Sequence, residues 1–501
     1  MSQYTLLTGA TGLLGRYLMR DLLQRGVRLA VLARPSKRES ARQRIEGILQ
    51  MWESQLGCDL PRPVCLEGDI CSERLGLDEQ AVRWVRNHCP SMLHSAASLS
   101  FHAEPNGEPW RSNVGGTRNM LDLCQAAGIR QLHYVSTAYV CGLRRGRIME
   151  SDLDFGQPFR NDYEKSKLEA ETLVRQADFL DCLTVYRPAV IAGDSITGYT
   201  NTYHGLYMYL KLMSVLVWNT EPGPDGVRDT PVRLEMTGDE PRNIVPVDWV
   251  SEAMCRLFTT PAAHGDTYHL APVNPITPRQ IIEAGYKYFN SRGVEFVGPP
   301  VPERMESEDG PISDIDRNAH ENMHMYKEYE DSDPEFDTTN LLKFTSDLPC
   351  PDIDEVMLHR FWRYGEEDRW GKRKQPVVKL TLNIEALLTR VRGEHDTSDT
   401  TSNCNCGGTR QIGIDIIGAG GGQWTLFLRD GNLSDFIVGI ASTSEAVVKF
   451  TSYQFTKLLD NVSLEEPSED TKVALASSRL SGQSLTETLL GLLSSSPVSM
   501  T

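Results

Sequence analysis

The first fifteen residues contain a glycine pattern that restricts the fold of everything after them. An apolar run from Tyr4 is followed by Gly9, Gly12 and Gly15, and then by a helical pattern over residues 16–24. A strand that turns through glycines into a helix directs backbone N–H groups and the helix dipole at a diphosphate. The pattern therefore predicts an α/β fold with a doubly wound parallel sheet of the Rossmann type. A glycine-rich turn without a ligand is the alternative.

The strand expected over residues 27–33 ends in a basic residue. An NAD site has an acidic residue at this point, which holds the ribose 2′-hydroxyl. This chain has Arg34 instead, with Lys37 and Arg38 close behind. Cations here suit a ribose 2′-phosphate, so the sequence predicts NADPH as the cofactor. A solvated basic loop is the alternative.

Two further positions are expected beside the cofactor. Asp69 and Ile70 follow a short strand over residues 64–67, where an aspartate can accept from an adenine amino group or cap the next turn. The small side chains around Ala96 let a backbone approach the cofactor closely. The predicted cofactor contacts up to this point are Gly9, Thr11, Gly12, Leu13, Leu14, Gly15, Arg34, Asp69, Ile70 and Ala96.

A tyrosine and a lysine four residues apart form the candidate proton-transfer pair. Tyr163 and Lys167 lie in a strongly helical segment, so their side chains share one helix face. A neighbouring cation favours the phenolate and lowers the pKa of Tyr163, so the pair can pass a proton to an oxygen that gains charge during hydride transfer. Thr137, after the strand over residues 131–135, would supply a second hydroxyl to that oxygen. An ordinary helix-surface pair is the alternative.

The totals exclude several classes of protein. A chain of 501 residues is expected to form two or three domains, and a net charge of −17 argues against a nucleic-acid partner. No stretch reaches the length needed to span a bilayer, and no signal peptide is visible. Eleven scattered cysteines suit reduced thiols and predict a cytoplasmic location. Cys404 and Cys406 are too closely spaced for a usual zinc site, so no metal is expected.

These motifs resemble the extended short-chain dehydrogenases/reductases, and among them the thioester reductases and fatty acyl-CoA reductases. The resemblance covers residues 1–290. It rests on T-G-A-T-G-L-L-G from Thr8, H-S-A-A-S-L-S-F from His94, N-V-G-G-T from Asn113, V-S-T-A-Y-V-C-G from Val135, Y-E-K-S-K from Tyr163 and Y-R-P-A-V-I-A-G from Tyr186. It implies Thr137, Tyr163 and Lys167 as catalytic residues, with Asn113 at a supporting position. Lys167 would also bind the nicotinamide ribose.

The implied activity is NADPH-dependent reduction of an acyl thioester to an aldehyde or an alcohol. The thiol would belong to coenzyme A or to an acyl carrier protein. Two alternatives stay open, an NAD(P)-dependent hydroxysteroid or ketone dehydrogenase and a non-catalytic lipid carrier. Leu206–Trp218 is apolar but too short to span a membrane, so we expect a buried helix that could also line a channel for a long apolar chain. His269 is expected in the core.

We expect three parts in the chain. Residues 1–300 would form the NADP-binding reductase domain with a small substrate subdomain, and residues 301–376 an acidic linker with a helical extension. Residues 377–501 would form an α+β domain with antiparallel strands. Its segments W-T-L-F-L-R-D-G from Trp424 and A-V-V-K-F-T-S-Y-Q-F-T-K-L-L from Ala446 resemble a sterol-carrier-type lipid-binding domain. That resemblance implies a lipid ligand, and a purely structural module is the alternative.

Overall fold

A seven-stranded parallel sheet in the order β11-β7-β5-β4-β1-β2-β3 forms the centre of the protein. All of its strand pairs are parallel. Its apolar strands are short and mostly buried, as a sheet covered on both faces requires. They are β1 (Thr5–Thr8), β2 (Leu29–Ala33), β3 (Val64–Glu67), β4 (Ser91–His94), β5 (Gln131–Val135), β7 (Cys182–Pro188) and β11 (Thr267–Leu270). The predicted Rossmann-type sheet is confirmed.

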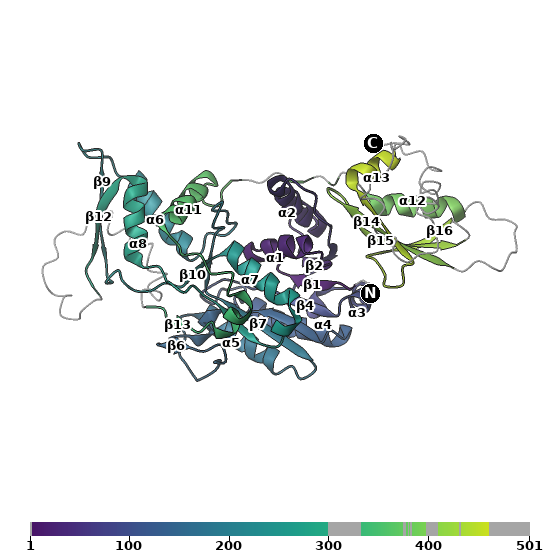
Figure 1. Ribbon diagram of the computed structural model, residues 1–501, viewed down its shortest axis with the longest axis horizontal. Coiled ribbons are helices and arrows are strands. Elements are labelled where there is room, and N and C mark those ends of the chain that lie inside the picture. Colours follow the sequence, from purple (N-terminus) through teal and green to yellow (C-terminus); the bar gives the residue numbers. More distant parts are fainter. Residues whose placement is uncertain are drawn as a thin grey trace.

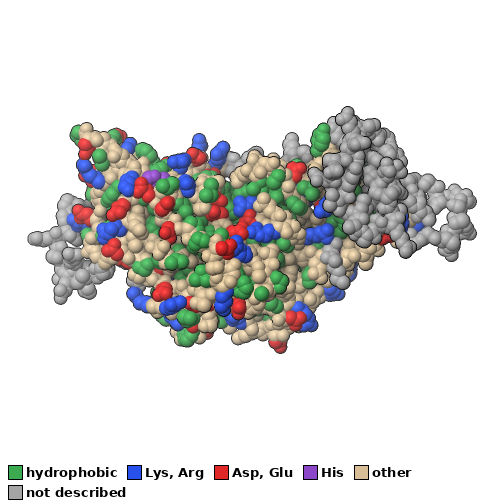
Figure 2. Space-filling view, in the orientation of Figure 1, with side chains coloured by type: hydrophobic (Ala, Val, Ile, Leu, Met, Phe, Trp, Pro, Cys, Tyr) green, Lys and Arg blue, Asp and Glu red, His purple; other side chains and the backbone are tan. Residues whose placement is uncertain are grey.

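The coordinates are a computed structural model that describes residues 3–298, 332–373, 377–378, 380, 383–396, 409–429 and 432–459. Cys404 and Cys406 lie outside these residues, and so does the part of the expected acidic linker over residues 301–331. Among the residues described, no helix combines the length and apolar character that crossing a bilayer requires. Acidic and basic side chains are interspersed over the face seen in Figure 2 and do not gather in one patch.

Helices cover both faces of the sheet (Figure 1). One face packs in a single core with α1 (Leu13–Gln24), α2 (Ala41–Leu56) and α7 (Val247–Thr259). The other face packs with α3 (Glu79–His88), α4 (Gly116–Ala127) and α5 (Asp162–Arg175). Short helical turns connect several elements: η1 (Glu73–Gly76), η2 (Arg111–Gly115), η3 (Ala138–Cys141) and η4 (Pro261–Ala263).

A smaller subdomain lies beside the carboxyl ends of the strands. Its helices α6, α8 and α11 pack around a core that includes Leu210, Phe289 and Trp362. The segment after residue 332 therefore contributes to two cores. Its helix α11 packs in this subdomain, whereas its first strand pairs with β6 and packs, together with α10, on the core of the parallel sheet. The elements of the subdomain are β8 (Val190–Ala192), α6 (Leu206–Trp218), β9 (Arg228–Leu234), β10 (Ile244–Pro246), α8 (Pro278–Phe289), β12 (Ser291–Phe296) and α11 (Glu355–Glu367). The elements that pack on the core of the parallel sheet are β6 (Arg147–Ile148), β13 (Glu335–Phe336) and α10 (Thr339–Thr345).

The C-terminal residues form a separate four-stranded sheet in the order β16-β15-β14-β17. Its elements are α12 (Ile384–Asp396), β14 (Arg410–Ile417), β15 (Gly422–Arg429), β16 (Asn432–Val438), β17 (Ala446–Thr451) and α13 (Ser452–Leu459). The expectation of antiparallel strands is wrong for β17, which runs parallel to β14. The connection over residues 439–445 explains this direction. It begins at the end of β16, beside the start of β15, and crosses to the opposite edge of the sheet, where β17 begins beside the start of β14.

Candidate active site

A cavity of about 540 Å³ lies at the carboxyl ends of the parallel strands, between the sheet and the small subdomain. Side chains that follow β1, β4, β5 and β7 form its floor, which is where open α/β sheets bind their ligands. The opposite wall is apolar and comes from α6, β9 and α8. That wall includes Leu206, Tyr209, Leu234, Ile281 and Ile282. The apolar helix expected at Leu206–Trp218 thus contributes directly to the cavity.

The glycine turn after β1 has the close packing that a diphosphate cradle needs. Gly9 has a φ of +77°, and a Cβ there would come 2.7 Å from the backbone nitrogen of Ala96. A Cβ at Gly15 would come 2.0 Å from the carbonyl oxygen of Gly9. Side chains are therefore excluded at both positions, so the backbone at the start of α1 stays open to a ligand. These observations fit a dinucleotide at this turn.

The predicted cofactor residues fall into two groups in the structure. Gly9, Gly12, Leu13, Leu14 and Gly15 line the cavity, together with Lys167. The other predicted contacts are near the same turn or farther along the same sheet edge and do not line the cavity: Thr11, Arg34, Asp69, Ile70 and Ala96. The backbone nitrogen of Ala96 donates to the Thr8 hydroxyl at 3.3 Å, which ties the end of β4 to the end of β1.

Arg34 and Arg44 come together beyond the end of β2, and Arg16 of α1 is near enough to act on the charge of Arg44. Arg34 is exposed, and its ion pair with Asp69 is long at 3.6 Å. The Arg44 guanidinium donates to the carbonyl oxygen of Arg34 at 2.5 Å, which brings a second cation to the same loop. Burial and the charges of Arg34 and Arg16 lower the pKa of Arg44. Mutual repulsion among these cations would be relieved by a bound phosphate.

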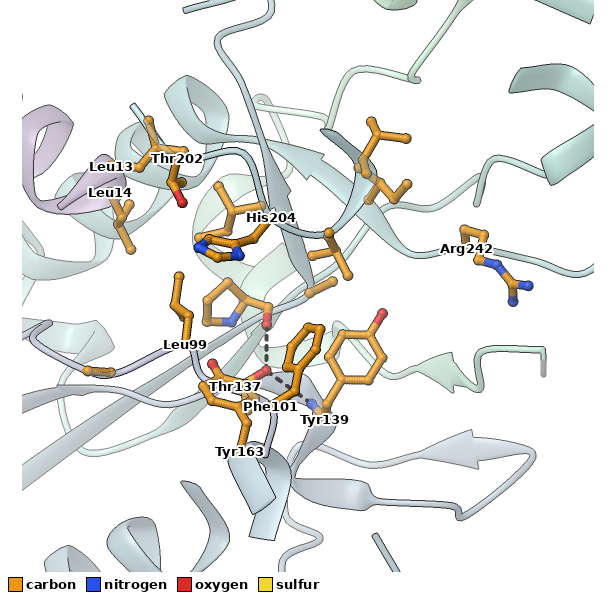
Figure 3. A pocket seen from close by; sticks show the side chains of 18 of the residues that line it. Leu13, Leu14, Leu99, Phe101, Thr137, Tyr139, Tyr163, Thr202, His204 and Arg242 are labelled. Carbon is orange, nitrogen blue, oxygen red and sulfur yellow. Dashed lines mark hydrogen bonds between the residues drawn. The ribbon is translucent and has the colours of Figure 1, made fainter. Parts of the chain in front are cut away.

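Tyr163 and Thr137 lie together in the cavity wall (Figure 3). Tyr163 is the second residue of α5, and Thr137 follows the end of β5. Burial raises the pKa of Tyr163 to about 12, and a hydrogen bond with Thr137 opposes that rise. The phenol is therefore protonated at neutral pH and can donate to an oxygen in the cavity. Thr137 is fixed by contacts with the carbonyl oxygen of Pro188 at 3.4 Å and the backbone nitrogen of Tyr139 at 3.3 Å.

Lys167 lies one turn further along α5 and also lines the cavity. Its Nζ donates to the carbonyl oxygen of Val135 at 2.9 Å and to the Tyr134 hydroxyl at 3.3 Å. Burial lowers the pKa of Lys167 to about 8, while the charge of Glu171 raises it. The expectation that Lys167 lowers the pKa of Tyr163 is not met in this arrangement, because burial raises that pKa and the hydrogen bond with Thr137 is what opposes the rise.

Asn113 lies behind the cavity, in a π-helical turn that opens α4. Its Oδ1 accepts from the backbone nitrogen of Ser98 at 2.8 Å, and its Nδ2 donates to the Ser166 hydroxyl at 2.9 Å. Ser98 belongs to the loop that carries Leu99 and Phe101 into the cavity wall, whereas Ser166 is on α5. Asn113 therefore joins this loop to the helix of Tyr163 and Lys167, which makes it a positioning residue.

The cavity has a polar corner around Asp333 that no sequence pattern predicted. The Tyr139 hydroxyl donates to Asp333 Oδ2 at 2.8 Å, and the backbone nitrogen of Asn243 donates to the same oxygen at 2.9 Å. His204 and Arg242 line the cavity as well (Figure 3). Tyr139 belongs to a quoted motif, but no spacing signal links it to Asp333, which is 194 residues away. His269, by contrast, is buried in the core as predicted.

No metal centre is formed by the side chains that the structure describes. Among those residues, no group of three or more histidines, cysteines, aspartates or glutamates could hold an ion.

Comparison with known proteins gives consistent matches. A family model described as "Male sterility protein", an NAD-binding family, matches residues 7–254. The nonribosomal peptide synthetase asaC of Aspergillus flavus is 28% identical over 282 residues, which is 54% of this chain and 26% of that protein. An aldehyde reductase of the same species, lnaA, is 25% identical over 396 residues, which is 72% of this chain and 35% of that protein. The chain thus spans about a quarter to a third of the length of these curated relatives.

A solved structure shows the same architecture. The terminal R domain from the myxalamid PKS-NRPS biosynthetic pathway is 26% identical and superposes with a TM-score of 0.58, covering 74% of this chain and 93% of that domain. The matched family segment contains the glycine turn, Asn113, Thr137, Tyr163 and Lys167. The chain therefore belongs, through residues 7–254, to the male sterility protein family and has the extended short-chain dehydrogenase/reductase fold of thioester reductase domains.

Proposed function

We propose that this protein is an NADPH-dependent reductase of acyl thioesters. The observation that carries the proposal is the single cavity in which the glycine turn, Thr137, Tyr163 and Lys167 meet an apolar wall. Such a cavity can hold a nicotinamide against a carbonyl group and can bind an apolar chain beside it. The names of the relatives, a peptide synthetase, an aldehyde reductase and a terminal R domain, support the same chemistry.

The choice of NADPH over NADH rests on the three arginines beyond β2. A ribose 2′-hydroxyl gains little from Arg34, Arg44 and Arg16, whereas a 2′-phosphate can accept several charge-assisted hydrogen bonds from them. Arg34 forms an ion pair with Asp69. That pair is weak, because its charged atoms are 3.6 Å apart and lie at the protein surface. Arg34 therefore has capacity for a phosphate.

The mechanism follows from the protonation states in the cavity. The glycine turn and Lys167 would hold the dinucleotide, which, when bound, would supply a hydride for the carbonyl carbon of the thioester. Tyr163, protonated because burial raises its pKa to about 12, donates a hydrogen bond to the carbonyl oxygen as negative charge develops there. Thr137 supplies a second hydroxyl to the same oxygen. Lys167 would orient the nicotinamide ribose through an amine that Val135 and Tyr134 already hold in place.

Collapse of the resulting tetrahedral alkoxide breaks the carbon–sulfur bond. The thiolate leaves, it takes up a proton, and an aldehyde remains. A second hydride transfer, with a proton from Tyr163, would convert that aldehyde to an alcohol. The relatives named above favour a thioester on a carrier protein, and acyl-CoA is the other thioester substrate of this chemistry. A lipid ligand of the C-terminal domain and a cytoplasmic location stay predictions from the sequence.

The test is NADPH oxidation by the purified protein with long-chain acyl-CoA and with acylated carrier protein, followed by mass spectrometry of the products. We expect an aldehyde or an alcohol, and we expect Tyr163→Phe to reduce kcat by about 10² to 10⁴ because the proton donor is lost. Tyr268→Phe is the matched control, since its hydroxyl is buried and donates to the Ala263 carbonyl oxygen at 2.6 Å, away from the cavity. Turnover of a sterol ketone with no thioester turnover would overturn the proposal.

A further inference from the structure

The C-terminal domain lies against the nucleotide-binding domain and away from the active-site cavity. In Figure 1 it is on the far side of the central sheet from α6 and α8, which border the cavity. No described residue beyond Asp333 lines that cavity. A role in handing a ligand directly into the cavity therefore has no support in this arrangement, and the contacts that the domain does make point to another role.

The first contact zone is a buried polar network near the amino end of β1. The Tyr4 hydroxyl donates to Gln423 Oε1 at 2.5 Å and accepts from the backbone nitrogen of Ile440 at 2.9 Å. Gln423 Nε2 donates in turn to Asp415 at 3.1 Å. Trp84 of α3 adds an indole N–H bond to the carbonyl oxygen of Val438 at 2.6 Å. Separating the domains would break these bonds together, so they hold the C-terminal domain in a defined position against β1 and α3.

The second contact zone is one face of α2. Gly420 donates its backbone N–H to Glu46 at 3.1 Å, and Arg42 donates to the carbonyl oxygen of Gly421 at 3.3 Å. Gln43 donates to the carbonyl oxygen of Val378 at 3.4 Å. The Val378 side chain also lies over Gly47, where a Cβ would come within 3.3 Å of it. These contacts cover the first two turns of α2 from the side opposite the sheet.

The same two turns organise the basic loop after β2. Ser40 and Gln43 form a capping box, in which Gln43 Oε1 accepts from the backbone nitrogen of Ser40 at 2.9 Å. Gln43 thus holds the end of the loop with one side-chain atom and Val378 with the other. Arg44 bonds to the Arg34 carbonyl oxygen from the next position of the helix. The loop itself is mostly exposed, so its geometry depends on the start of α2.

We infer that the C-terminal domain is a cofactor-positioning domain: by covering the first turns of α2 it fixes the loop and the arginines, Arg34 and Arg44, that bind the 2′-phosphate. This inference rests on the proposed use of NADPH. It assigns a role to Gln43, Glu46 and Gly47 on α2 and to Tyr4, none of which touches the cavity. Loss of the domain contact would weaken NADPH more than NADH, because only NADPH has the phosphate.

The experiment compares the dissociation constants of NADPH and NADH, measured by isothermal titration calorimetry on the full-length protein without substrate. Gly47→Leu places a large side chain between α2 and Val378, and leucine is a better helix former than glycine, so the helix itself is not weakened. Tyr4→Phe loosens the other contact zone. For each variant we expect a roughly threefold to tenfold loss of NADPH affinity, the range covered by one or two net hydrogen bonds, and little change for NADH.

Two further variants separate the possible failures. Arg34→Ala removes a direct phosphate contact, so it should reduce the preference for NADPH whether or not the C-terminal domain matters. If Arg34→Ala leaves that preference unchanged, the proposed phosphate site is wrong. If Arg34→Ala reduces it while Gly47→Leu and Tyr4→Phe leave it intact, or weaken both cofactors equally, the positioning role is wrong. Tyr268→Phe, a buried hydroxyl remote from both contact zones, should change neither constant.

Discussion

The active-site cavity and the contact zone around Tyr4 lie at opposite ends of β1, and their buried polar groups have different surroundings. In the cavity, burial lowers the pKa of Lys167 to about 8 and raises that of Tyr163 to about 12. At the interface, Tyr4, Gln423 and Asp415 are equally buried but are linked by short hydrogen bonds to one another. Burial disfavours the charged form in both sets, because it also raises the pKa of Tyr4 to about 12 and raises that of Asp415. The difference is that Tyr163 and Lys167 line an open cavity, whereas the interface groups bond to one another across the two domains.

The groups at the interface stabilise the fold, whereas the groups in the cavity serve the chemistry. A buried amine that burial drives toward its neutral form reduces the free energy of unfolding at neutral pH. A buried hydroxyl with both a donor and an acceptor partner adds to it. Substitutions in the cavity should therefore trade activity against stability, whereas substitutions at the interface should reduce stability and cofactor preference and leave the chemical step intact.

Lys167→Met is the strongest test of this contrast. We expect kcat to fall by about 10² to 10⁴, since the nicotinamide ribose loses its amine partner and Tyr163 loses the cation nearby. The same variant should raise the free energy of unfolding at pH 7, by at most about 3 kcal/mol, because a pKa lowered from 10.5 to about 8 represents that much destabilisation. The lost bond to Val135 offsets part of the gain. Urea unfolding gives the free energies.

The pH dependence fixes the sign of this effect. Below pH 8 the amine is protonated in both the folded and the unfolded chain, so the whole destabilisation by Lys167 is present. Between pH 8 and 10.5 the unfolded chain binds more protons, so stability rises with pH in the wild type. In Lys167→Met this rise should be missing. A variant that is less stable than the wild type at pH 7, with the rise retained, would show that the buried amine stabilises the fold.

Asn113→Ala tests whether the cavity depends on the loop that carries Leu99 and Phe101. The variant removes the bonds that join Ser98 to Ser166, so we expect the loop to shift relative to α5. A displacement of about 1 Å can reduce kcat by about 10². Gln157→Ala is a suitable control, because Gln157 is a buried amide that bonds to the Val140 and Leu153 carbonyl oxygens and does not line the cavity. Equal losses in both variants would assign the effect of Asn113 to general destabilisation.

The cavity floor could be predicted from the sequence because its residues occur in local motifs. Gly9, Gly12 and Gly15 share one turn, and Tyr163 and Lys167 share one helix face, so short-range geometry is enough to group them. The same reasoning predicted the pKa of Tyr163 in the wrong direction. A spacing of four residues shows that two side chains are near each other, but burial, which dominates here, depends on the whole fold.

The interface and the polar corner of the cavity could not be predicted in this way. Tyr4 meets Gln423, 419 residues later in the chain, and Tyr139 meets Asp333, 194 residues later. Neither pair has a spacing or a motif that a sequence reveals, because each depends on how separate bodies pack. The C-terminal strands themselves followed from alternation, but the parallel pairing of β17 depends on a crossing connection that alternation does not encode.

Gln423→Leu probes the interface itself and should have the smallest effect on activity. Leucine removes the acceptor for the Tyr4 hydroxyl and the donor to Asp415, which leaves buried polar groups without partners. We expect the free energy of unfolding to fall by about 1–3 kcal/mol, the usual cost of such a loss, with kcat unchanged at saturating NADPH.

Burial already raises the pKa of Asp415, and the bond from Gln423 lowers it, so the variant should raise that pKa further. The destabilisation should therefore be larger at pH 7 than at a pH low enough to protonate Asp415, because a protonated carboxyl needs less hydrogen bonding. Urea unfolding at the two pH values measures this difference. If the stability loss is independent of pH, the interface is stabilised by the Tyr4 bonds and not by the bond from Gln423 to Asp415. A fall in kcat would contradict the expectation that substitutions at the interface leave the chemical step intact.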